Sequence, residues 1–271
     1  VSAHDYHVIL HNTSNLVELE RQALHFMEEL RVDGAIFIST SRVTDNTHLA
    51  DFARRVPFVA LNRYVRDDFP ATAVVIDHHR AGYLAARHLL ERGYRRLAFL
   101  GTKIDGPNPL YASIARLEGF RRAVEEAGLS WGDVYVHLEP KGRFDAADGH
   151  RAMQQVLHIL GSKLPLGVYA VNDYAAAGAV RAALEAGLRI PGDVAVVGND
   201  DLEVASRLFP SLTSISQRLD VAGAAAATAL LALLAGDAPA TRHTIQPELI
   251  VRESTSGTLP PAAAPSGGTA P

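Results

Sequence analysis

The chain contains no cysteine among its 271 residues. This absence excludes disulfide bonds, thiolate nucleophiles and zinc sites with cysteine ligands. It also fits a reducing compartment such as the cytoplasm. The sequence therefore points away from thiol chemistry and from a disulfide-stabilised fold.

The chain also lacks a basic cluster and a long apolar segment. Lys and Arg number 26 against 30 Asp and Glu, which gives a formal net charge of −4, and the basic residues are scattered. Because binding to a phosphate backbone needs a basic stripe or patch, direct DNA contact by these residues is not expected. No apolar run is long enough to span a bilayer, and the first residues do not read as a secretion signal. The sequence predicts a cytoplasmic protein.

What the sequence does contain is an alternation of short β-branched runs with amphipathic segments of helical length, the pattern of βαβ units around a parallel sheet. Gly128 and Gly187 stand just past two of the helical segments, where glycine favours the left-handed conformation that ends a helix. Strands are expected at Tyr6–Leu10, Gly34–Ser39, Pro57–Leu61, Ala73–Asp77, Arg96–Gly101, Val134–Leu138, Gly167–Val171, Val194–Gly198 and Glu248–Arg252, and helices at Leu16–Leu30, Ala81–Arg92, Ala115–Ala127, Gly149–Leu160, Ala175–Ala186 and Val221–Leu234.

Polar residues recur directly after these strands. In open parallel sheets a ligand binds outside the carboxyl ends of the strands, so such residues are candidates for a small-molecule site. Each residue taken singly is equally well explained as a helix cap or a turn residue. Several strand ends carry two or three polar residues, however, which is more than a cap requires. The residues are Thr40 and Ser41, Asn62 and Arg63, Asp77, Thr102 and Lys103, Asn172 and Asp173, and Asn199, Asp200 and Asp201.

An ordered series of phrases resembles the effector-binding core of LacI/GalR-family transcriptional regulators. The fold of that core is similar to type I periplasmic sugar-binding proteins. The most specific stretch is VNDYAAAGAVRAALEAG, followed by IPGDVAVVGNDD and LTSISQ. Further matches are VDGAIFIS, PFVALNR, VVIDHHRAGYLAARHLLERGYRRLAFLG, ARLEGFRRAVEEAGL and GHRAMQQVL, so that the resemblance covers nearly the whole chain.

The resemblance implies an α/β fold of two doubly wound parallel-sheet subdomains, which are joined by three crossovers and close on a small molecule between them. Mapped onto this chain, the N-terminal subdomain would comprise residues 1–101 plus 217–237. The C-terminal subdomain would comprise residues 102–216 plus 238–252. Residues 259–271 have too little apolar content to pack and are expected to form a disordered tail.

Two charged residues match the main effector contacts of the family. Arg116, in the ARLEGF phrase, matches the arginine that reaches the ligand, and a guanidinium offers a planar fork of donors to hydroxyls or a carboxylate. Its alternative is an ordinary surface arginine on a helix. Asp200 matches the carboxylate that accepts hydrogen bonds from ligand hydroxyls or amines. Its alternative is a turn or cap residue.

Four further positions match the family's cleft, each with a structural alternative. Asn172 matches another polar contact, whereas Asp173 is as well explained as the cap of the following helix. Phe144 matches an aromatic position that can stack on a sugar or a base, and its competitor is a core phenylalanine. Gln217 lies at a crossover, where it would respond to closure or be purely structural.

The chain departs from the family pattern at its start. The family opens with a helix-turn-helix and a first strand and helix, whereas Tyr6–Leu10 corresponds to the second strand. A missing first strand would leave neighbouring backbone groups and apolar faces uncovered. We therefore expect either a truncated product or a poorly formed N-terminal subdomain, with operator DNA reached only through a separate N-terminal domain.

Three functions were weighed: a ligand-sensing regulator, a periplasmic sugar-binding transport receptor, and an α/β enzyme. The regulator is favoured by GYRRLAFLG and LTSISQ, and no motif of a hydrolase, a phosphate loop, a dinucleotide site or a metal helix supports an enzyme. No cofactor is expected. His78 and His79 are interpreted as surface histidines. The effector is expected to be a sugar or related polyol, with a nucleobase or nucleoside as the alternative, and the family implies a homodimer.

Overall fold

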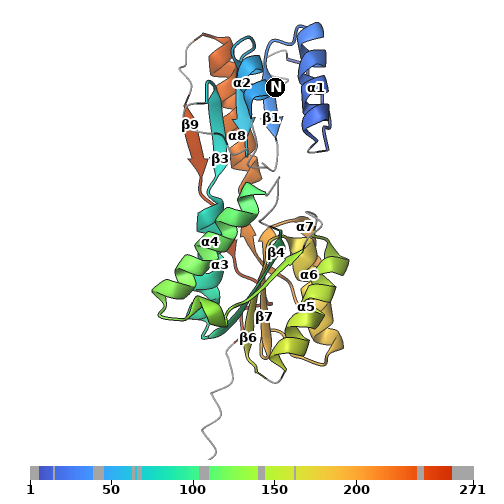
Figure 1. The fold of residues 1–271 in the computed structure, drawn as a ribbon, viewed down its shortest axis with the longest axis vertical. Helices are drawn as coiled ribbons and strands as arrows, with labels where there is room; N and C mark the ends of the chain where they lie inside the picture. Colours follow the sequence, from blue (N-terminus) through green and yellow to red (C-terminus); the bar gives the residue numbers. More distant parts are fainter. Residues whose placement is uncertain are drawn as a thin grey trace, which may run out of the picture.

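The computed structural model describes residues 6–14, 16–38, 46–62, 65, 69–103, 110–139, 144–161, 163–236 and 241–257. The expected tail at 259–271 and the strand-end residues Thr40, Ser41 and Arg63 lie outside the described residues. The described chain forms two α/β units that follow one another along the long axis of the molecule (Figure 1). Each unit is built on its own sheet, as the family resemblance implied.

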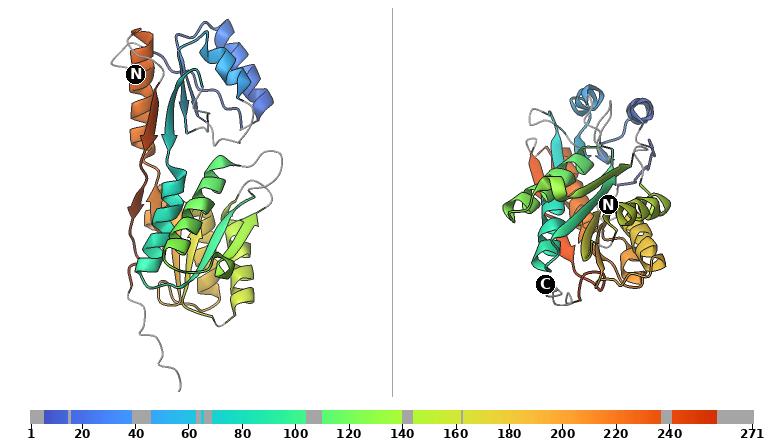
Figure 2. Two further views of the ribbon diagram at one scale, coloured as in Figure 1. Left: turned by 60° about the vertical axis from the view of Figure 1, so that its left-hand side comes forward. Right: turned by 60° about the horizontal axis from the view of Figure 1, so that its bottom comes forward.

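The first unit contains a four-stranded sheet in the order β1-β2-β3-β9, in which each neighbouring pair is parallel. Helices α1 (Val17–Glu29) and α2 (Thr47–Ala53) cover one face, and α8 (Leu219–Leu234) covers the other (Figure 2). Both faces are therefore covered at β1, β2 and β3, which explains why these three strands are short apolar runs, whereas the edge strand β9 (RHTI) is largely exposed. The strands are β1 (Ala35–Ile38), β2 (Phe58–Leu61), β3 (Thr72–Ile76) and β9 (Arg242–Ile245).

The second unit contains a six-stranded sheet in the order β10-β8-β7-β6-β4-β5. Only β10 runs antiparallel to its neighbour among these strands. Helices α3 (His78–Glu91) and α4 (Tyr111–Glu126) pack together, as do α5 (Ala146–Leu160) and α6 (Asp173–Glu185), and the two pairs lie on opposite sides of this sheet (Figures 1 and 2). The strands are β4 (Arg96–Thr102), β5 (Tyr135–Glu139), β6 (Leu166–Ala170), β7 (Val194–Asp200), β8 (Thr213–Ser216) and β10 (Glu248–Ile250).

Local signals define the helices of the second unit. Asp77 caps α3 by accepting a hydrogen bond from the backbone N–H of Arg80, and Asp145 and Asp148 form a capping box at the start of α5. Gly128 and Gly187 take the left-handed conformation predicted for them, each with φ of +74°. The helices are α3 (His78–Glu91), α4 (Tyr111–Glu126), α5 (Ala146–Leu160), α6 (Asp173–Glu185) and the short α7 (Glu203–Arg207), together with a 3-10 turn at Trp131–Asp133.

The chain passes between the two units three times. It leaves the first unit after β3 at Asp77, returns after β8 at Gln217, and leaves again between β9 and β10. Two elements fall on the other side of the expected boundaries. Helix α3 packs on α4, and β4 pairs with β5 and β6, so residues 78–101 are part of the second unit. Strand β9 pairs with β3 and is part of the first unit, not of the second.

The strand expected at Tyr6–Leu10 is wrong, because these residues form neither helix nor strand. Their apolar side chains are exposed, with Leu10 at 90% and Val8 at 73%. Strand β1 pairs with β2 alone among the described strands, so its outer edge has no partner there. An isolated apolar run gains nothing from strand geometry without a neighbour to pair with and a surface to cover.

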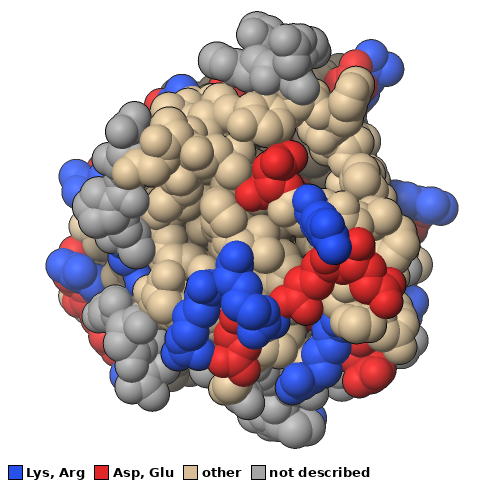
Figure 3. Space-filling view, turned by 90° about the horizontal axis from the view of Figure 1, so that it is seen from above, with Lys and Arg blue, Asp and Glu red and all other residues tan. Residues whose placement is uncertain are grey.

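The surface carries charges of both signs. Seen from the end formed by the first unit, Lys and Arg side chains lie next to Asp and Glu side chains, and much of that face carries neither (Figure 3). Within the part of the chain that the structure describes, no helix is both long and apolar enough to cross a membrane.

Candidate functional site

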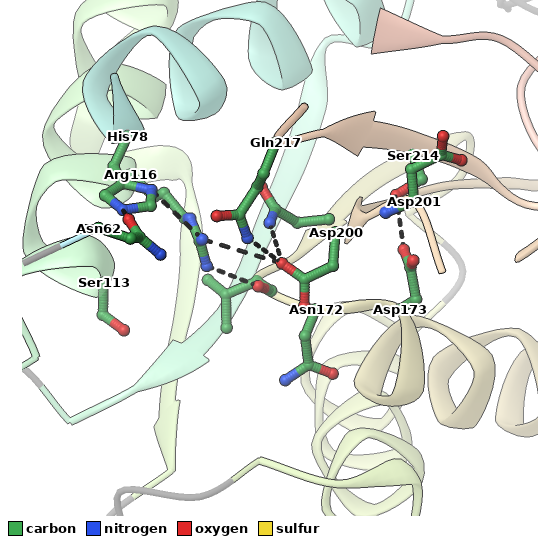
Figure 4. Close-up of polar contacts among 12 residues, drawn as sticks. Asn62, His78, Ser113, Arg116, Asn172, Asp173, Asp200, Asp201, Ser214 and Gln217 are labelled. Atoms are coloured by element: carbon green, nitrogen blue, oxygen red, sulfur yellow. Dashed lines mark hydrogen bonds and ion pairs between the residues drawn. The ribbon is translucent and has the colours of Figure 1, made fainter. Parts of the chain in front are cut away.

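Arg116 is the centre of a polar cluster where the two units meet (Figure 4). It lies on α4 and is 8% exposed. Its Nη1 donates to the carbonyl oxygen of Val171 at 2.8 Å, and its Nη2 donates to Nδ1 of His78 at 3.3 Å and lies 4.0 Å from Oδ1 of Asp200. Its Nε is buried and has no partner among the described residues. The guanidinium therefore keeps donor capacity for a further group.

Asp200 faces Arg116 from the end of β7. Its Oδ1 accepts from Nδ2 of Asn199 at 2.6 Å and from Nε2 of Gln217. Burial raises the pKa of Asp200, and this effect is opposed by the positive charge of Arg116 and by the two hydrogen bonds. About a quarter of the side chain is exposed, at 24%. A carboxylate held in this way can still accept hydrogen bonds from hydroxyl or amine groups.

Gln217 completes the arrangement from the crossover between β8 and α8. The residue is 6% exposed, and its amide nitrogen donates to Asp200. Its Oε1 is buried without a partner among the described residues. Buried polar atoms are normally paired, so this oxygen and Nε of Arg116 mark a place where a bound molecule or water can supply the missing bonds.

Asn172 and Phe144 are adjacent to this cluster but are engaged with each other. Asn172 is the N-cap of α6, where its Oδ1 accepts from the backbone N–H of Ala175 at 2.8 Å, and its Nδ2 donates to the carbonyl oxygen of Phe144 at 2.8 Å. The Phe144 ring is only 4% exposed and is stacked on His137, with ring centroids 6.0 Å apart. This geometry favours the alternatives stated above, a helix cap and a core phenylalanine.

Asp173 does not cap α6, since Asn172 does so. Its side chain is fully buried and lies between β7 and β8, where Oδ2 accepts from the backbone N–H of Leu202 at 2.7 Å and Oδ1 accepts from the hydroxyl of Ser214 at 2.6 Å. Burial raises the pKa of Asp173 to about 7. The residue is thus close in space to Asp200, but its own bonds are made within the second unit.

His78 is the residue that the sequence reasoning misjudged. The sequence predicts a surface histidine here, yet His78 is 5% exposed and joins the two units. Its Nε2 is 2.9 Å from Oδ1 of Asn62, which follows β2 of the first unit, and its Nδ1 faces Arg116 of the second. Burial and the charge of Arg116 hold the pKa of His78 well below its usual range. Its position directly after the N-cap Asp77, at a crossover, was the available signal.

The arrangement is suited to binding a small polar molecule. Among the described residues, no group of three or more His, Asp and Glu side chains could hold a metal ion. The cluster combines a guanidinium, a carboxylate, two amides and a neutral imidazole from five separate elements of chain. This set offers both donors and acceptors to one small polar molecule.

Comparisons with known proteins decide the family. Residues 86–255 match the model of a periplasmic binding protein-like domain. The chain is 32% identical over 253 residues to the HTH-type transcriptional repressor PurR of Klebsiella pneumoniae subsp. pneumoniae, an alignment that covers 93% of this chain and 71% of the repressor. The chain belongs to the LacI family of transcriptional regulators. Its described residues form the periplasmic-binding-protein-like effector core of that family.

Solved structures agree with this assignment. The transcription regulator GntR from Chromobacterium violaceum superposes with a TM-score of 0.80 at 27% identity, and the match covers 94% of this chain and 90% of that one. A LacI family transcriptional regulator from Enterococcus faecium with bound ribose gives a TM-score of 0.71 at 26% identity, covering 86% and 83%. The predicted fold class is confirmed, and so is the prediction of a regulator core in place of an enzyme.

Proposed function

We propose that the chain senses a small polar effector, most simply a sugar or related polyol, in the cluster formed by Arg116, Asp200 and Gln217. Binding would control the attachment of a cytoplasmic homodimer to operator DNA through a separate DNA-binding domain. The ligand biases the regulator only if its affinity differs between two arrangements of the two units. Arg116 would donate to ligand oxygens, and Asp200 would accept from hydroxyl groups.

The observation that carries this proposal is the convergence of Arg116 and Asp200 beside two buried polar atoms that have no partner among the described residues. The two charged groups come from α4 and from the end of β7, and their closest approach is 4.0 Å. Two oppositely charged groups that stay this far apart leave room for a ligand hydroxyl to bridge them. A polyol offers many O–H groups that both donate and accept, which suits this mixed set.

A purine base is a second candidate ligand, and one observation favours it. The curated relatives reported above are repressors named PurR. A flat base would need an aromatic surface to stack on, and the described Phe144 is covered by His137. We therefore place a polyol first and a purine second.

The proposal is tested by a thermal-shift screen followed by calorimetric titration. The panel comprises free sugars, sugar phosphates, nucleobases and nucleosides, because a ligand that binds only the folded state raises Tm by mass action. A compound that binds the wild-type chain is expected to lose at least about tenfold in affinity in Asp200→Asn and in Arg116→Lys, since each substitution leaves a buried partner unmatched.

Two matched variants control for general effects. Arg121→Lys alters an exposed arginine on the same helix as Arg116, where it pairs with Glu125. Asp220→Asn alters an exposed aspartate on α8. Both are expected to bind the same compound as tightly as the wild type. Binding that survives Asp200→Asn and Arg116→Lys together would move the effector site away from this cluster.

A further inference from the structure

Asp173 lies directly behind the turn that carries Asp200. It is the first residue of α6 and is completely buried. Both of its carboxyl oxygens are used as acceptors, one by the backbone N–H of Leu202 at 2.7 Å and the other by the hydroxyl of Ser214 at 2.6 Å. A buried carboxylate without hydrogen-bond donors would be strongly destabilising. The two donors that face Asp173 therefore compensate for the burial of its carboxyl group.

The turn that Asp173 holds is strained. Asp200 and Asp201 have φ angles of +108° and +55°, and residues other than glycine rarely have a positive φ. Such backbone persists only where the surroundings impose it. Here the backbone N–H of Asp201 donates to Oγ of Ser214 at 3.1 Å, and the hydroxyl of Ser214 in turn donates to Asp173. The backbone amides of the two residues that follow Asp200 are therefore both connected to the Asp173 carboxyl group, Leu202 directly and Asp201 through Ser214.

The position of the Asp173 carboxyl is fixed from the other side by β7. A methyl group at Gly198 would lie 2.3 Å from Oδ1 of Asp173, so the carboxyl fits against the strand backbone only because residue 198 is glycine. The carboxyl thus has little freedom to move independently of β7. Figure 4 shows Asp173 beside Ser214 and Asp201, with Asp200 pointing the other way, toward Arg116.

We propose that Asp173 is a positioning residue for the effector site: through the amide of Leu202 and the Ser214 bridge to Asp201, it holds the strained turn that directs Asp200 at Arg116. This inference rests on the effector-binding function proposed above. It assigns to Asp173 a role that acts through Asp200, and it excludes direct contact between Asp173 and the effector. Effector affinity then depends on the protonation state of Asp173.

The protonation state matters because protonation converts one of the two acceptor oxygens into an O–H donor. With its pKa raised to about 7 by burial, Asp173 is charged in mildly alkaline solution and neutral in mildly acidic solution. The groups that face it are Asp200 and Asp201 at the end of β7, Ser214 on β8 and Tyr169 on β6. Protonation would turn one of these two accepted bonds into a donated one: the Ser214 hydroxyl would have to rotate and accept from Asp173, or the Leu202 amide would lose its acceptor. The turn is therefore held most firmly above about pH 7.

Two more charges act on the turn from outside. Arg116 opposes the upward shift that burial gives the pKa of Asp200, and Arg252 pairs with Asp201 at 2.7 Å. Asp200 also titrates, so the pH dependence of binding would by itself mix two carboxyl groups. Side-chain carboxyl resonances separate them, since each aspartate gives its own signal.

The first experiment needs no effector. In ¹³C,¹⁵N-labelled wild-type chain, the Cγ signal of Asp173 is expected to titrate near neutral pH, and the Leu202 amide and the Asp200 Cγ signal should move with the same midpoint. Asp173→Asn, which reproduces the neutral carboxyl in shape, should abolish that step at Leu202. Asp201→Asn is the matched control and should retain it. A Leu202 amide and an Asp200 carboxyl that stay constant while Asp173 titrates would overturn the proposal.

The second experiment measures binding of D-ribose, cellobiose and hypoxanthine by calorimetry at pH 6 and pH 8. The compound that binds the wild type should bind more tightly at pH 8. It should bind Asp173→Asn about two- to thirty-fold more weakly than the wild type at pH 8, the range for residues that act through others, and its affinity for this variant should show no step with the midpoint of Asp173. Equal affinity of the variant and the wild type at pH 8 would also overturn the proposal.

The two experiments separate the two proposals. If none of the three compounds binds the wild type, the effector assignment fails for those classes, whereas the resonance titration still decides the role of Asp173. If Asp173→Asn does not fold, Ser214→Ala replaces it. This variant keeps the carboxyl and its Leu202 bond but removes the bridge to Asp201, and it should shift the Asp201 amide and weaken binding while the Leu202 step remains. An unchanged Asp201 amide in Ser214→Ala contradicts the proposal.

Discussion

At the scale of single residues, the imidazole of His78 determines how the two units present their polar groups to each other. A guanidinium has only donors, so Nδ1 of His78 must accept from Arg116, and Nε2 must then carry the proton that is donated to Asn62. This fixes the Asn62 amide with its oxygen toward His78 and its NH₂ group free to face another acceptor. One neutral imidazole thus sets the donor pattern on the first unit's side of the site.

The predicted tautomer can be observed directly. Because burial and Arg116 hold the pKa of His78 well below its usual range, we expect a neutral ring with the proton on Nε2 throughout pH 6 to 8. Long-range ¹H–¹⁵N correlation spectra distinguish this form from the other tautomer and from imidazolium. Asn62→Ala removes the acceptor of Nε2 and should shift that nitrogen signal while leaving the ring neutral. An imidazolium signal at pH 7 would contradict the geometry.

The charged form of Asp173 is predicted to lower the free energy of unfolding, although it positions Asp200 in the effector site. Its folded-state pKa of about 7 lies above the ordinary value of 3.8, so the folded state holds the proton more tightly than the unfolded state. The stability contributed by the protonated form is fully present below about pH 4 and is lost as the pH rises toward 7. Asp173→Asn should therefore raise the free energy of unfolding at pH 8 by up to about 4 kcal/mol.

This difference should disappear at pH 4, which urea unfolding at the two pH values would measure. A variant that is less stable than the wild type at pH 8 would mean that the hydrogen bonds to Leu202 and Ser214 outweigh the burial of the charge. A gain in stability together with weaker binding is the pattern expected where a site keeps a destabilising group for its function.

At the scale of elements, the helix pairs of the second unit approach each other through glycine. A methyl group at Gly178 of α6 would lie 1.9 Å from the carbonyl oxygen of Ala146, and one at Gly149 of α5 would lie 2.1 Å from that of Ala175. The pair α3 and α4 repeats the arrangement at Gly82 and Gly119. These contacts bring α4, and with it Arg116, into place, because the neighbour that a Cβ would meet is rigid backbone.

Gly178→Ala is expected to lower the free energy of unfolding by about 1–3 kcal/mol, since the added methyl group forces the two helices apart. Gly223→Ala in α8 is the matched control. Apart from the neighbouring residues and backbone of its own helix, no atom of the described residues lies within 4 Å of the added methyl group there, so the better helix propensity of alanine should raise stability by about 0.5–1 kcal/mol. Denaturant unfolding of the two variants gives opposite signs, and equal signs would rule out the packing argument.

A helix or strand can be predicted from the sequence where the residues that determine it lie within the segment itself. Gly128 and Gly187 end their helices as predicted, because left-handed backbone is a property of the residue itself. Most helices and strands of the second unit follow from periodicity in the same way, whereas the short α7 and β8 were not predicted. The segment Tyr6–Leu10 has the composition of a strand but pairs with no strand among the described residues. Strand β4 belongs to the second unit because it pairs with β5 and β6. Pairing is not encoded in the segment itself.

The residues of the candidate site likewise fall into those that the sequence predicted correctly and those that it did not. Arg116, Asp200 and Gln217 come together as the resemblance implied, whereas Asn172 and Phe144 are engaged with each other. Asp173 is not a helix cap and His78 is not a surface histidine, which were the structural interpretations of these residues. Their partners Leu202, Ser214 and Asn62 are remote in sequence, so no local motif indicates these contacts. Motif matching identifies which positions can touch a ligand, but the burial of a side chain between two sheets is decided by tertiary packing.

At the scale of the whole molecule, the two units have cores of unequal size. One hydrophobic cluster spans the second unit from α3 to β8. The first unit has two smaller clusters, one on each face of its sheet. Exposed apolar side chains occur in both units, but a dense series of them lies at the start of the first: Val8, Ile9, Leu10, Leu16, Phe26, Leu30 and Ile38. Since stability grows with the apolar area that a core buries, the first unit should be the weaker one.

We therefore expect amides of β1, β2 and β3 to exchange with solvent through openings of lower free energy than amides of β4, β6 and β7. Native-state hydrogen exchange measures both sets in one sample. A bound effector that contacts Arg116, Asp200 and Asn62 stabilises only the state in which both units are folded, so it should raise the protection of β2 and β3 toward that of the second unit. Identical opening free energies in the two sheets without effector would show that the units unfold together. The three chain crossings and the His78 bridge would then couple the units more strongly than the difference between their cores separates them.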